Sequence, residues 1–541
     1  MLKQQRKIDP EMFEMILDSI NKLEKEKLPL ETKLKLDFTG EYPADLIRFI
    51  MGPEMGLHLL FISDEYGGLG ASAYELAVIS ERMAKMDLAI ATSFLVVCLG
   101  MDPIRVGATP DQKARYIPRI AEEGLMMAYG VTEPNAGSNV QALKTRAERV
   151  VDDSGKITGY KINGQKQFIT NAAVADLYTI LAETPEGPSF FVVEKGTPGL
   201  QPGKHEDKHG IRASNTSPLV LQDVFIPAEN LLGGVEGQGL KQANEVFGYT
   251  RLMVAAFGLG GGMASLERVL KYSKERIQFK TTLAEKQGYT HKLVVPHAVQ
   301  LEAARAFIEE TTYKLDSSDE DRQVEGSIAK YFATEAGDKM ANDGIQAFGG
   351  YGYMREYEVE KIKRDIKILT IYEGTSEIQQ NIISMFRLRS TIRTNGEFYE
   401  NYAKALDKLP ADTKGPLLAQ TIRALNQVIM TARQCRLTVY QYVMFLLADM
   451  ITWCEVANAL CHKATVYEGE QGRSVDYMKA CARLFVRETI EKVFINGLKI
   501  AQGCDLASED IKKNLEALNI GLAMREILTD MDLISKELTA D

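Results

Sequence analysis

The stretch DLYTILAETPEGPSFFVVEKG, residues 176–196, decides the class of fold. It holds two short runs of partly alternating apolar and polar residues, DLYTILAET and SFFVVEKG, on either side of a turn that contains Pro and Gly. Such runs between turn-forming residues are typical of antiparallel strands. KTRAERVV, GKITGYKIN and SPLVLQDVFIP have the same character and lie in the same part of the chain. The sequence therefore predicts a β domain, a small barrel or sandwich, over residues 125–235.

Helical patterns flank this β domain, so the fold is expected to be mainly α with an inserted β domain. Apolar residues recur at helical spacing over residues 1–124, as in AYELAVISERMAKMDLAIATSFLVVCLG, and again over residues 236–390. The sequence GLGGGMAS, residues 258–265, is similar to a dinucleotide-binding fingerprint. It lies inside a helical pattern with no strand before it, so it indicates close helix packing instead.

The last part of the chain is predicted to form an additional helical bundle, over residues 391–541. RTNGEF and KLPADTKGP, which follow Arg389, have few apolar residues and indicate a linker. The run from Leu417 to Glu468 contains neither Gly nor Pro, and two Gly-poor stretches follow it. Long segments without helix breakers favour helices.

Composition limits the possible functions. The chain has 541 residues, of which 45% are apolar and 26% charged, as expected for a protein with a large buried core. Its net charge is −10 and no block of basic residues offsets it, which argues against a nucleic-acid partner. The most apolar run, Leu437 to Leu460, is interrupted by Asp449 and Glu455 and predicts a buried helix rather than a membrane span. The first residues resemble neither a signal peptide nor a transit peptide, so a cytoplasmic location is expected.

The cysteines show no metal-binding or disulfide pattern. None of the six forms a CxxC pair, which favours buried reduced thiols and predicts no metal site. They are Cys98, Cys435, Cys454, Cys461, Cys481 and Cys504.

Two polar segments beside the predicted strands could hold a flat ligand. YGVTEPNAGSNV, residues 129–140, offers hydroxyl and amide groups, and Gly137 lets the backbone approach a ligand closely. Taken alone, this segment is equally an N-capped turn. GQKQFITNA, residues 164–172, places Phe168 near Thr170 at a strand end, where a ring and a hydroxyl could cover and bind a flavin. A half-buried strand phenylalanine is an equally ordinary interpretation.

Two further segments lie in the second helical region. RIQF, residues 276–279, contains an arginine suited to a pyrophosphate, although most helical arginines face solvent. IQAFGGYGYMREYEVEKIKRDIKILTIYEGTSEIQ, residues 345–379, is more specific. Gly349, Gly350 and Gly352 allow the backbone to pack against a nucleotide. Glu373 lies between the apolar sequence IKILTIY and a Gly-Thr-Ser turn, a setting that suits the general base for a weak carbon acid. Without the other segments it would be interpreted as a solvated glutamate at a helix end.

Together, and in this order, the four segments resemble the acyl-CoA dehydrogenase family from about Glu11 to Arg389. ISDEYGGLG, HGIRASNTSPLVLQDVFIPAENLLG and YTRLMVAA resemble family sequences as well. The resemblance implies an N-terminal helical domain, a central β-barrel or sandwich and a C-terminal four-helix bundle, with FAD as the cofactor. The region after Arg389 resembles, in position and helical texture, the extension of the very-long-chain members. Those members associate with membranes, whereas a packing domain between subunits is the alternative interpretation here.

The resemblance also implies a role for particular residues. Glu373 would be the catalytic base. FAD would be bound by Tyr129, Val131, Thr132, Gly137, Ser138, Phe168, Thr170, Arg276, Phe279, Gln346, Gly349, Gly350, Thr375 and Glu377. The acyl-CoA substrate would contact Ser138, Arg251, Tyr372 and Gly374.

The activity implied is α,β-dehydrogenation of an acyl-CoA thioester to a trans-2-enoyl-CoA. Glu373 would remove the α proton, and electrons would pass through FAD to an electron-transfer flavoprotein. A homodimer or homotetramer is expected, with a cytoplasmic location that could be peripheral to the inner membrane. An acyl-CoA oxidase, the reverse enoyl-CoA reductase direction and a scaffold without turnover remain alternatives. Relatives that act in DNA-damage responses lack the glutamate in this turn, whereas IYEGT is intact here.

Overall fold

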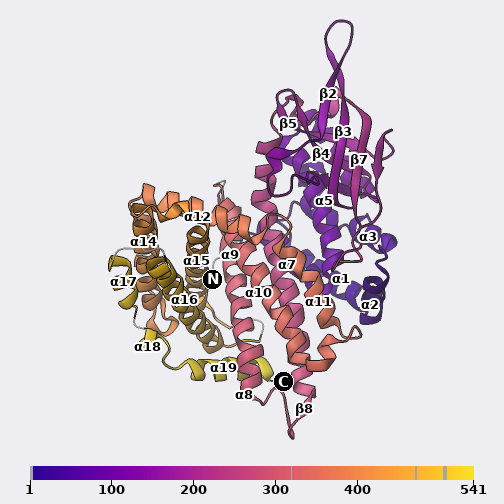
Figure 1. Ribbon diagram of the computed structural model, residues 1–541. Coiled ribbons are helices and arrows are strands. Elements are labelled where there is room, and N and C mark those ends of the chain that lie inside the picture. Colours follow the sequence, from indigo (N-terminus) through magenta and orange to yellow (C-terminus); the bar gives the residue numbers. More distant parts are fainter. Residues whose placement is uncertain (1–3, 319, 470–471, 504–508, 519, 541) are drawn as a thin grey trace. The chain divides into compact units, whose positions relative to one another are not determined.

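The computed structural model describes residues 4–318, 320–469, 472–503, 509–518 and 520–540. Two compact units make up the chain (Figure 1). The N-terminal unit is Gln5–Met253, and the C-terminal unit is Val254–Asp541 together with Met1–Gln4. The long helix α7, Gly239–Glu275, runs from the first unit into the second.

The N-terminal unit begins with helices whose starts are visible in the sequence. Ser72 and Glu75 form a reciprocal capping box at the start of α4, and Asp87 accepts hydrogen bonds from the first backbone amides of α5. Such caps satisfy amides that have no partner within the helix. Nearly all of α5 is buried, which makes it the core helix of this region. The helices are α1 (Pro10–Lys27), α2 (Leu30–Thr39), α3 (Ala44–Met51), α4 (Ala73–Met86), α5 (Leu88–Gly107) and α6 (Pro110–Glu123).

The predicted strands form a seven-stranded sheet in the same unit. The long strands β3 and β7 pair antiparallel, as do β2 with β3 and β4 with β5 (Figure 1). Their inner faces bury a core that includes Ile162, Ile180, Phe191 and Leu219. The strands are β1 (Met127–Gly130), β2 (Arg146–Val151), β3 (Ile157–Thr170), β4 (Leu177–Thr184), β5 (Gly187–Glu194), β6 (Leu200–Pro202) and β7 (Thr216–Pro227).

Two pairings differ from the antiparallel expectation, and the shorter one joins β2 to β4 in parallel at a single position, Arg146 opposite Glu183. Strand β1 pairs with β4 in parallel, Met127 opposite Leu177 and Gly130 opposite Ile180. The strands β2 and β3 lie between β1 and β4 in the sequence, so the chain crosses over before it returns beside β1, and a parallel pair requires such a crossover. The alternation that indicates a strand carries no information about which neighbour it meets.

The C-terminal unit is helical, and its first part is a bundle of α7, α9, α10 and α12. A Cβ atom added at Gly258 would lie 2.8 Å from the backbone of Ala333, and one at Gly262 would lie 3.0 Å from Cα of Gly337. The glycines of GLGGGMAS therefore bring α7 against α10, as predicted. The bundle region contains α8 (Gln287–Leu293), α9 (Val295–Ser317), α10 (Gln323–Phe348), α11 (Glu358–Ile366) and α12 (Ser376–Arg393).

The predicted additional bundle follows, grouped beside α9 (Figure 1), and we call it the extension. The expectation of a linker after Arg389 is wrong, because α12 continues to Arg393 and α13 follows almost at once. Tyr399, Ala403 and Leu406 are fully buried at spacings of four and three residues, a helical period hidden among polar residues. The extension contains α13 (Glu397–Leu406), α14 (Gly415–Gln434), α15 (Gln441–Val466), α16 (Val475–Gly503), α17 (Glu509–Glu516), α18 (Ile520–Ala523) and α19 (Ile527–Thr539).

A buried charge cluster joins the extension to the bundle. The guanidinium of Arg387 on α12 donates two 2.8 Å hydrogen bonds to the carboxylate of Glu455 on α15 and one of 3.1 Å to Glu325 on α10. The hydroxyl of Tyr399 donates to the same Glu455 at 2.9 Å. All four residues are buried. Glu455, one of the two acidic residues that interrupt the apolar run of α15, is thus the partner of a buried arginine.

Aromatic packing reinforces the same junction. The rings of Trp453 on α15 and Phe485 on α16 stack at 5.0 Å, and Phe332 of α10 meets Trp453 edge-on at 5.6 Å. By length and composition α5 and α15 could each cross a membrane, but 89% and 78% of their apolar windows are buried within the protein. The prediction of a buried helix at α15 is confirmed.

The described cysteines fit the expectation of free thiols. Cys98, Cys454, Cys461 and Cys481 are buried and Cys435 is partly buried, each without a disulfide. Cys504 lies outside the described residues.

Candidate active site

The predicted flavin loop of the N-terminal unit begins where β1 ends. The half-buried ring of Tyr129 stacks on Phe190 at 5.7 Å with an interplanar angle of 28°. Beyond it, the backbone groups of Glu133 and Ala136 exchange two hydrogen bonds, of 3.0 and 3.1 Å, and close a tight turn. Val131 is buried, Thr132 is half-buried, and Gly137 and Ser138 are exposed. The loop therefore presents its glycine and hydroxyl groups at the surface of the unit.

A buried ion pair fixes this loop. The ammonium of Lys166 lies 2.7 Å from the Oε1 atom of Glu133 and donates to the carbonyl oxygen of Val131 at 3.2 Å. The Glu133 carboxylate also accepts hydrogen bonds from the backbone amides of Lys144 and Thr145. Burial lowers the pKa of Lys166 to about 8. At Glu133 burial acts to raise the pKa, but the ammonium and the hydrogen bonds outweigh it and lower the pKa. Both groups are charged at neutral pH.

A β-bulge turns Phe168 out of the sheet. The register of β3 against β7 shifts between Lys166 and Ile169, and Phe168 has a φ of +58°. Its side chain is 65% exposed, an unusual state for a phenylalanine inside a strand. The backbone amide of Gln167 donates to the carbonyl oxygen of Thr132 at 2.9 Å, so the ring emerges next to the loop. An exposed aromatic face beside threonine hydroxyls suits a flat, hydrogen-bonding ring system.

In the C-terminal unit Glu373 occupies a strained turn. A short 3-10 helix, η7 (Lys367–Thr370), precedes it, and α12 follows with Thr375 as its N-cap. Glu373 has a φ of +54°, and Gly374 has a φ of +86°. A left-handed conformation at a non-glycine residue costs about 1–2 kcal/mol, and such residues cluster at functional sites. The turn predicted between the apolar sequence and the Gly-Thr-Ser motif is confirmed.

Two buried donors hold this turn, and the sequence interpretation missed both. The ammonium of Lys330 on α10 donates to the carbonyl oxygen of Gly374 at 2.7 Å. The side-chain amide of Gln379 donates to the carbonyl oxygens of Glu373 at 2.9 Å and Gly374 at 3.1 Å. Lys330 and Gln379 are both fully buried. Lys330 lies among the buried residues Ile328 and Phe332 of α10, and a lysine at such a core-facing position is the signal that could have revealed this role.

The segment RIQF forms a hairpin after α7 rather than part of a helix. Strands β8 (Ile277–Gln278) and β9 (Thr281–Thr282) are joined by Phe279 and Lys280. Phe279 is 92% exposed and has a φ of +49°. The guanidinium of Arg276 lies over the ring of Tyr351, 5.5 Å from its centre. The structure thus brings this segment next to the Gly-rich segment, two parts of the chain that are far apart in the sequence.

The Gly-rich segment leaves open space beside its backbone. Gly349 ends α10 with a φ of +61°, and Gln346 and Gly350 are exposed. A Cβ atom added at Gly349 or Gly350 would have no atom of the described chain within 4 Å. With Arg276 and the exposed Phe279 nearby, this surface has the cation, the ring and the bare backbone that a pyrophosphate and a nucleoside require.

The predicted residues therefore form two groups, one on each unit. Arg251 is buried on α7, Tyr372 is half-buried before Glu373, and Glu377 is exposed in the first turn of α12. The N-terminal unit carries Tyr129, Val131, Thr132, Gly137, Ser138, Phe168, Thr170 and Arg251. The C-terminal unit carries Arg276, Phe279, Gln346, Gly349, Gly350, Tyr372, Glu373, Gly374, Thr375 and Glu377.

Comparison with known proteins identifies the class. Three family models match the chain: the acyl-CoA dehydrogenase N-terminal domain over residues 10–124, the middle domain over 128–224 and the C-terminal domain over 237–388. The chain therefore belongs to the acyl-CoA dehydrogenase family and is a flavin-dependent oxidoreductase.

Individual relatives agree with this assignment. An acyl-CoA dehydrogenase of Bacillus subtilis is 37% identical over 365 residues, 66% of this chain and 93% of the relative. The short-chain-specific acyl-CoA dehydrogenase of Megasphaera elsdenii is 38% identical over 365 residues, 65% of this chain and 92% of the relative. Each match covers about two thirds of this chain.

A solved structure matches the whole chain, extension included. The acyl-CoA dehydrogenase from Bacillus anthracis, solved in complex with FAD, has a TM-score of 0.84 and 25% identity, covering 98% of this chain and 96% of that one. The butyryl-CoA dehydrogenase from Megasphaera elsdenii has a TM-score of 0.66 and 34% identity, covering 70% of this chain and 99% of its own. FAD is the cofactor of this family, and the exposed Phe168 with its neighbouring hydroxyl groups fits the flavin ring.

Proposed function

We propose that this protein removes the α proton and the β hydride of an acyl-CoA thioester, with Glu373 as the base, to form a trans-2-enoyl-CoA. The observation that carries the proposal is the strained turn at Glu373, fixed through two backbone carbonyl groups by Lys330 and Gln379. Buried hydrogen-bond donors keep the backbone of Glu373 in a strained conformation. This indicates that the orientation of the carboxylate is worth more to the protein than the stability that the strain costs.

Each group of site residues has a distinct task in this proposal. Glu373 accepts the α proton at its carboxylate. The β-bulge presents Phe168 to the flavin, while Arg276 and the bare backbone at Gly349 and Gly350 bind its pyrophosphate and adenosine side. FAD, when bound, supplies the acceptor for the hydride. The remaining assignments are those of the family resemblance, with Ser138, Arg251, Tyr372 and Gly374 on the substrate side.

An electron-transfer flavoprotein is the proposed electron acceptor. A solved structure described as the electron-transferring flavoprotein of Acidaminococcus fermentans has a TM-score of 0.66 and 33% identity to this chain, covering 70% of this chain and 99% of its own. That likeness supports the proposal that this protein passes its electrons to an electron-transfer flavoprotein. Assembly into a homo-oligomer is also proposed, because Phe279 and Tyr353 leave 92% and 80% of their side chains exposed on one subunit. Exposed rings of this size favour burial against a partner or cofactor.

The test is an anaerobic titration of the flavin-loaded protein with acyl-CoA thioesters. Butyryl-CoA, a branched, a cyclic and a long-chain thioester are each added while the long-wavelength flavin band is recorded. We expect bleaching by at least one thioester in the wild type and none in Glu373→Gln at equal flavin content. Equal bleaching in the variant would show that another group is the base, and no bleaching by any thioester would favour a scaffold.

The same preparation separates the remaining enzyme alternatives. An oxidase would consume oxygen with the thioester alone, whereas a dehydrogenase would need an electron-transfer flavoprotein to turn over. An enoyl-CoA reductase would reoxidise the reduced flavin when an enoyl-CoA is added. The Syntrophus aciditrophicus relative, 37% identical over 335 residues, is a cyclohex-1-ene-1-carbonyl-CoA dehydrogenase, which is why a cyclic thioester belongs in the panel.

A further inference from the structure

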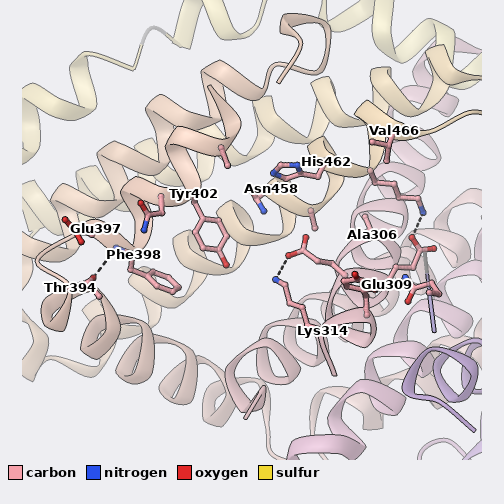
Figure 2. Close-up of a pocket in the computed structure, with 17 residues that line it drawn as sticks. Ala306, Glu309, Lys314, Thr394, Glu397, Phe398, Tyr402, Asn458, His462 and Val466 are labelled. Carbon is pink, nitrogen blue, oxygen red and sulfur yellow. Dashed lines mark hydrogen bonds and ion pairs between the residues drawn. The ribbon is translucent and has the colours of Figure 1, made fainter. Parts of the chain in front are cut away.

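The C-terminal unit contains a cavity of about 790 Å³ that has no part in the proposed reaction. It lies between α9 of the bundle and α13 and α15 of the extension (Figure 2). Ala306, Tyr313, Phe398, Tyr402 and Ala459 provide an apolar, largely aromatic lining. This volume is within the roughly 300–1,000 Å³ that small-molecule sites occupy.

The basic groups around the cavity are already paired. The ammonium of Lys463 lies 2.9 Å from the carboxylate of Glu309, and Lys314 pairs with Glu310. Glu397 also lines the cavity and forms no ion pair with any residue that the structure describes. The lining thus has one carboxylate in excess and no unpaired cation among the described residues, which disfavours an anionic ligand such as a fatty acid or a phosphate.

Three neutral polar groups in the cavity have no hydrogen-bond partner among the residues that the structure describes. Asn458 is 6% exposed, yet its side-chain amide makes no hydrogen bond to the part of the chain that the structure describes. The same holds for the hydroxyl of Tyr402 and the imidazole of His462 among the described residues. Asn458 and His462 are one turn apart on α15, and Tyr402 lies on α13 beside them (Figure 2).

The protonation states of these groups keep them neutral. Burial raises the pKa of Tyr402 well above its ordinary value, so its hydroxyl keeps its proton and can donate. Burial lowers the pKa of His462, so its ring is uncharged at neutral pH. Asn458 is buried, whereas Tyr402 and His462 are half-buried, and the polar groups of all three line the cavity, where a ligand could form hydrogen bonds with them.

We propose that this cavity binds a neutral, ring-bearing carbonyl compound of the quinone class. Its ring would lie among Tyr313, Phe398 and Tyr402, and its carbonyl oxygens would accept hydrogen bonds from the Tyr402 hydroxyl and the Asn458 amide. A fatty acid carboxylate would meet the excess negative charge instead. The site is formed only where the extension covers α9, so the shorter relatives would lack it.

Calorimetric titration of the flavin-loaded protein with duroquinone, a fully substituted benzoquinone, tests this proposal, with dodecanoate as the anionic comparison. We expect one duroquinone site per chain that acyl-CoA does not compete for, and no comparable dodecanoate binding. Asn458→Leu and Tyr402→Phe should each weaken duroquinone binding by about tenfold, the effect of one lost hydrogen bond. Ala405→Phe, which fills the cavity, should abolish it.

Two matched variants control for general effects. Asn496→Leu changes an equally buried asparagine of α16 that does not line the cavity, and Tyr442→Phe changes an exposed tyrosine of α15. Both should bind duroquinone like the wild type. Flavin content and bleaching by acyl-CoA should be unchanged in all five variants, which separates this proposal from the proposed reaction. The proposal is overturned if the wild type binds no duroquinone, if Ala405→Phe binds it equally, or if dodecanoate binds more tightly.

Discussion

The ammonium of Lys330 lies 2.7 Å from the carbonyl oxygen of Gly374, the residue that follows Glu373. Because Lys330 is fully buried in α10, its charge is directed onto the turn rather than into solvent. With Gln379 it fixes the two peptide groups that follow Glu373, a glutamate in a left-handed conformation. Lys330 is therefore a positioning residue for the proposed base, and it does not itself contact the reacting atoms.

Lys330→Met should lower kcat by about ten- to a hundredfold with little change in KM, because a displaced base affects the proton-transfer step more than binding. Lys330→Arg, which keeps a charged donor, should recover part of the loss. The measurements are steady-state kinetics with the best thioester of the panel and the flavin content of each variant. A proportional loss of flavin and activity, with normal kcat per bound flavin, would show a purely structural role.

Lys166→Met should destabilise the N-terminal unit by about 3–5 kcal/mol and weaken flavin binding, because Glu133 would remain buried without its cation. The loop would lose the two contacts of the Lys166 ammonium, with the carbonyl oxygen of Val131 and with the carboxylate of Glu133. Urea unfolding and flavin release measure the two effects. Lys161→Met, on the same strand with its side chain 49% exposed, is the matched control and should behave like the wild type.

Arg387→Met should separate the extension from the bundle before the rest of the chain unfolds. Removing the guanidinium leaves the buried Glu455 and Glu325 without a cation, a change that costs about 3–5 kcal/mol. Arg389→Met changes an exposed arginine on the same helix and provides the comparison. Limited proteolysis should cut the extension of the first variant only; equal resistance of both would argue against Arg387 as the fastening residue.

The stability of the extension should depend on pH through Glu488. Burial raises the pKa of Glu488 to about 7, and Gln300 donates to its carboxylate at 3.1 Å. The pKa of Glu488 is higher in the folded protein than its ordinary value, so the protonated carboxyl group favours the folded state. This contribution to the free energy of unfolding is complete below about pH 4.5 and is lost as the pH rises through 7. Glu488→Gln, which cannot ionise, should therefore be more stable than the wild type at pH 8 by about 3 kcal/mol.

At pH 5 the two proteins should have nearly the same free energy of unfolding. Glu516→Gln replaces an exposed glutamate of α17 and should show no such dependence. Unfolding by urea at both pH values provides the comparison. A difference that does not change with pH would mean that Glu488 titrates normally.

Local patterns in the sequence predicted the strands, the flanking helices and the turn at Glu373, because each depends on neighbouring residues. Strand β3 and its exposed end at Phe168 are examples. Features that depend on distant contacts were not predictable. The parallel pairing of β1 and the hydrogen bond from Lys330 are set by tertiary packing.

The cavity also depends on contacts between distant parts of the chain, and it could not be predicted from the sequence. It forms from α9, α13 and α15, whose lining residues are separated by up to about 160 positions, and no period within any one helix marks it. Asn458 in particular looks like an ordinary polar residue on a long apolar helix. Only its burial without a partner among the described residues distinguishes it.

The ion pair between Arg387 and Glu455 also bears on how such a protein can evolve. A stop codon just after Arg393 would yield a chain close in length to the shorter relatives, yet Arg387 would keep only Glu325 as its acidic partner. The aromatic surface around Phe332 would lose Trp453 and Phe485 in the same event. Loss of the extension would therefore require compensating substitutions in the bundle, which makes its acquisition hard to reverse.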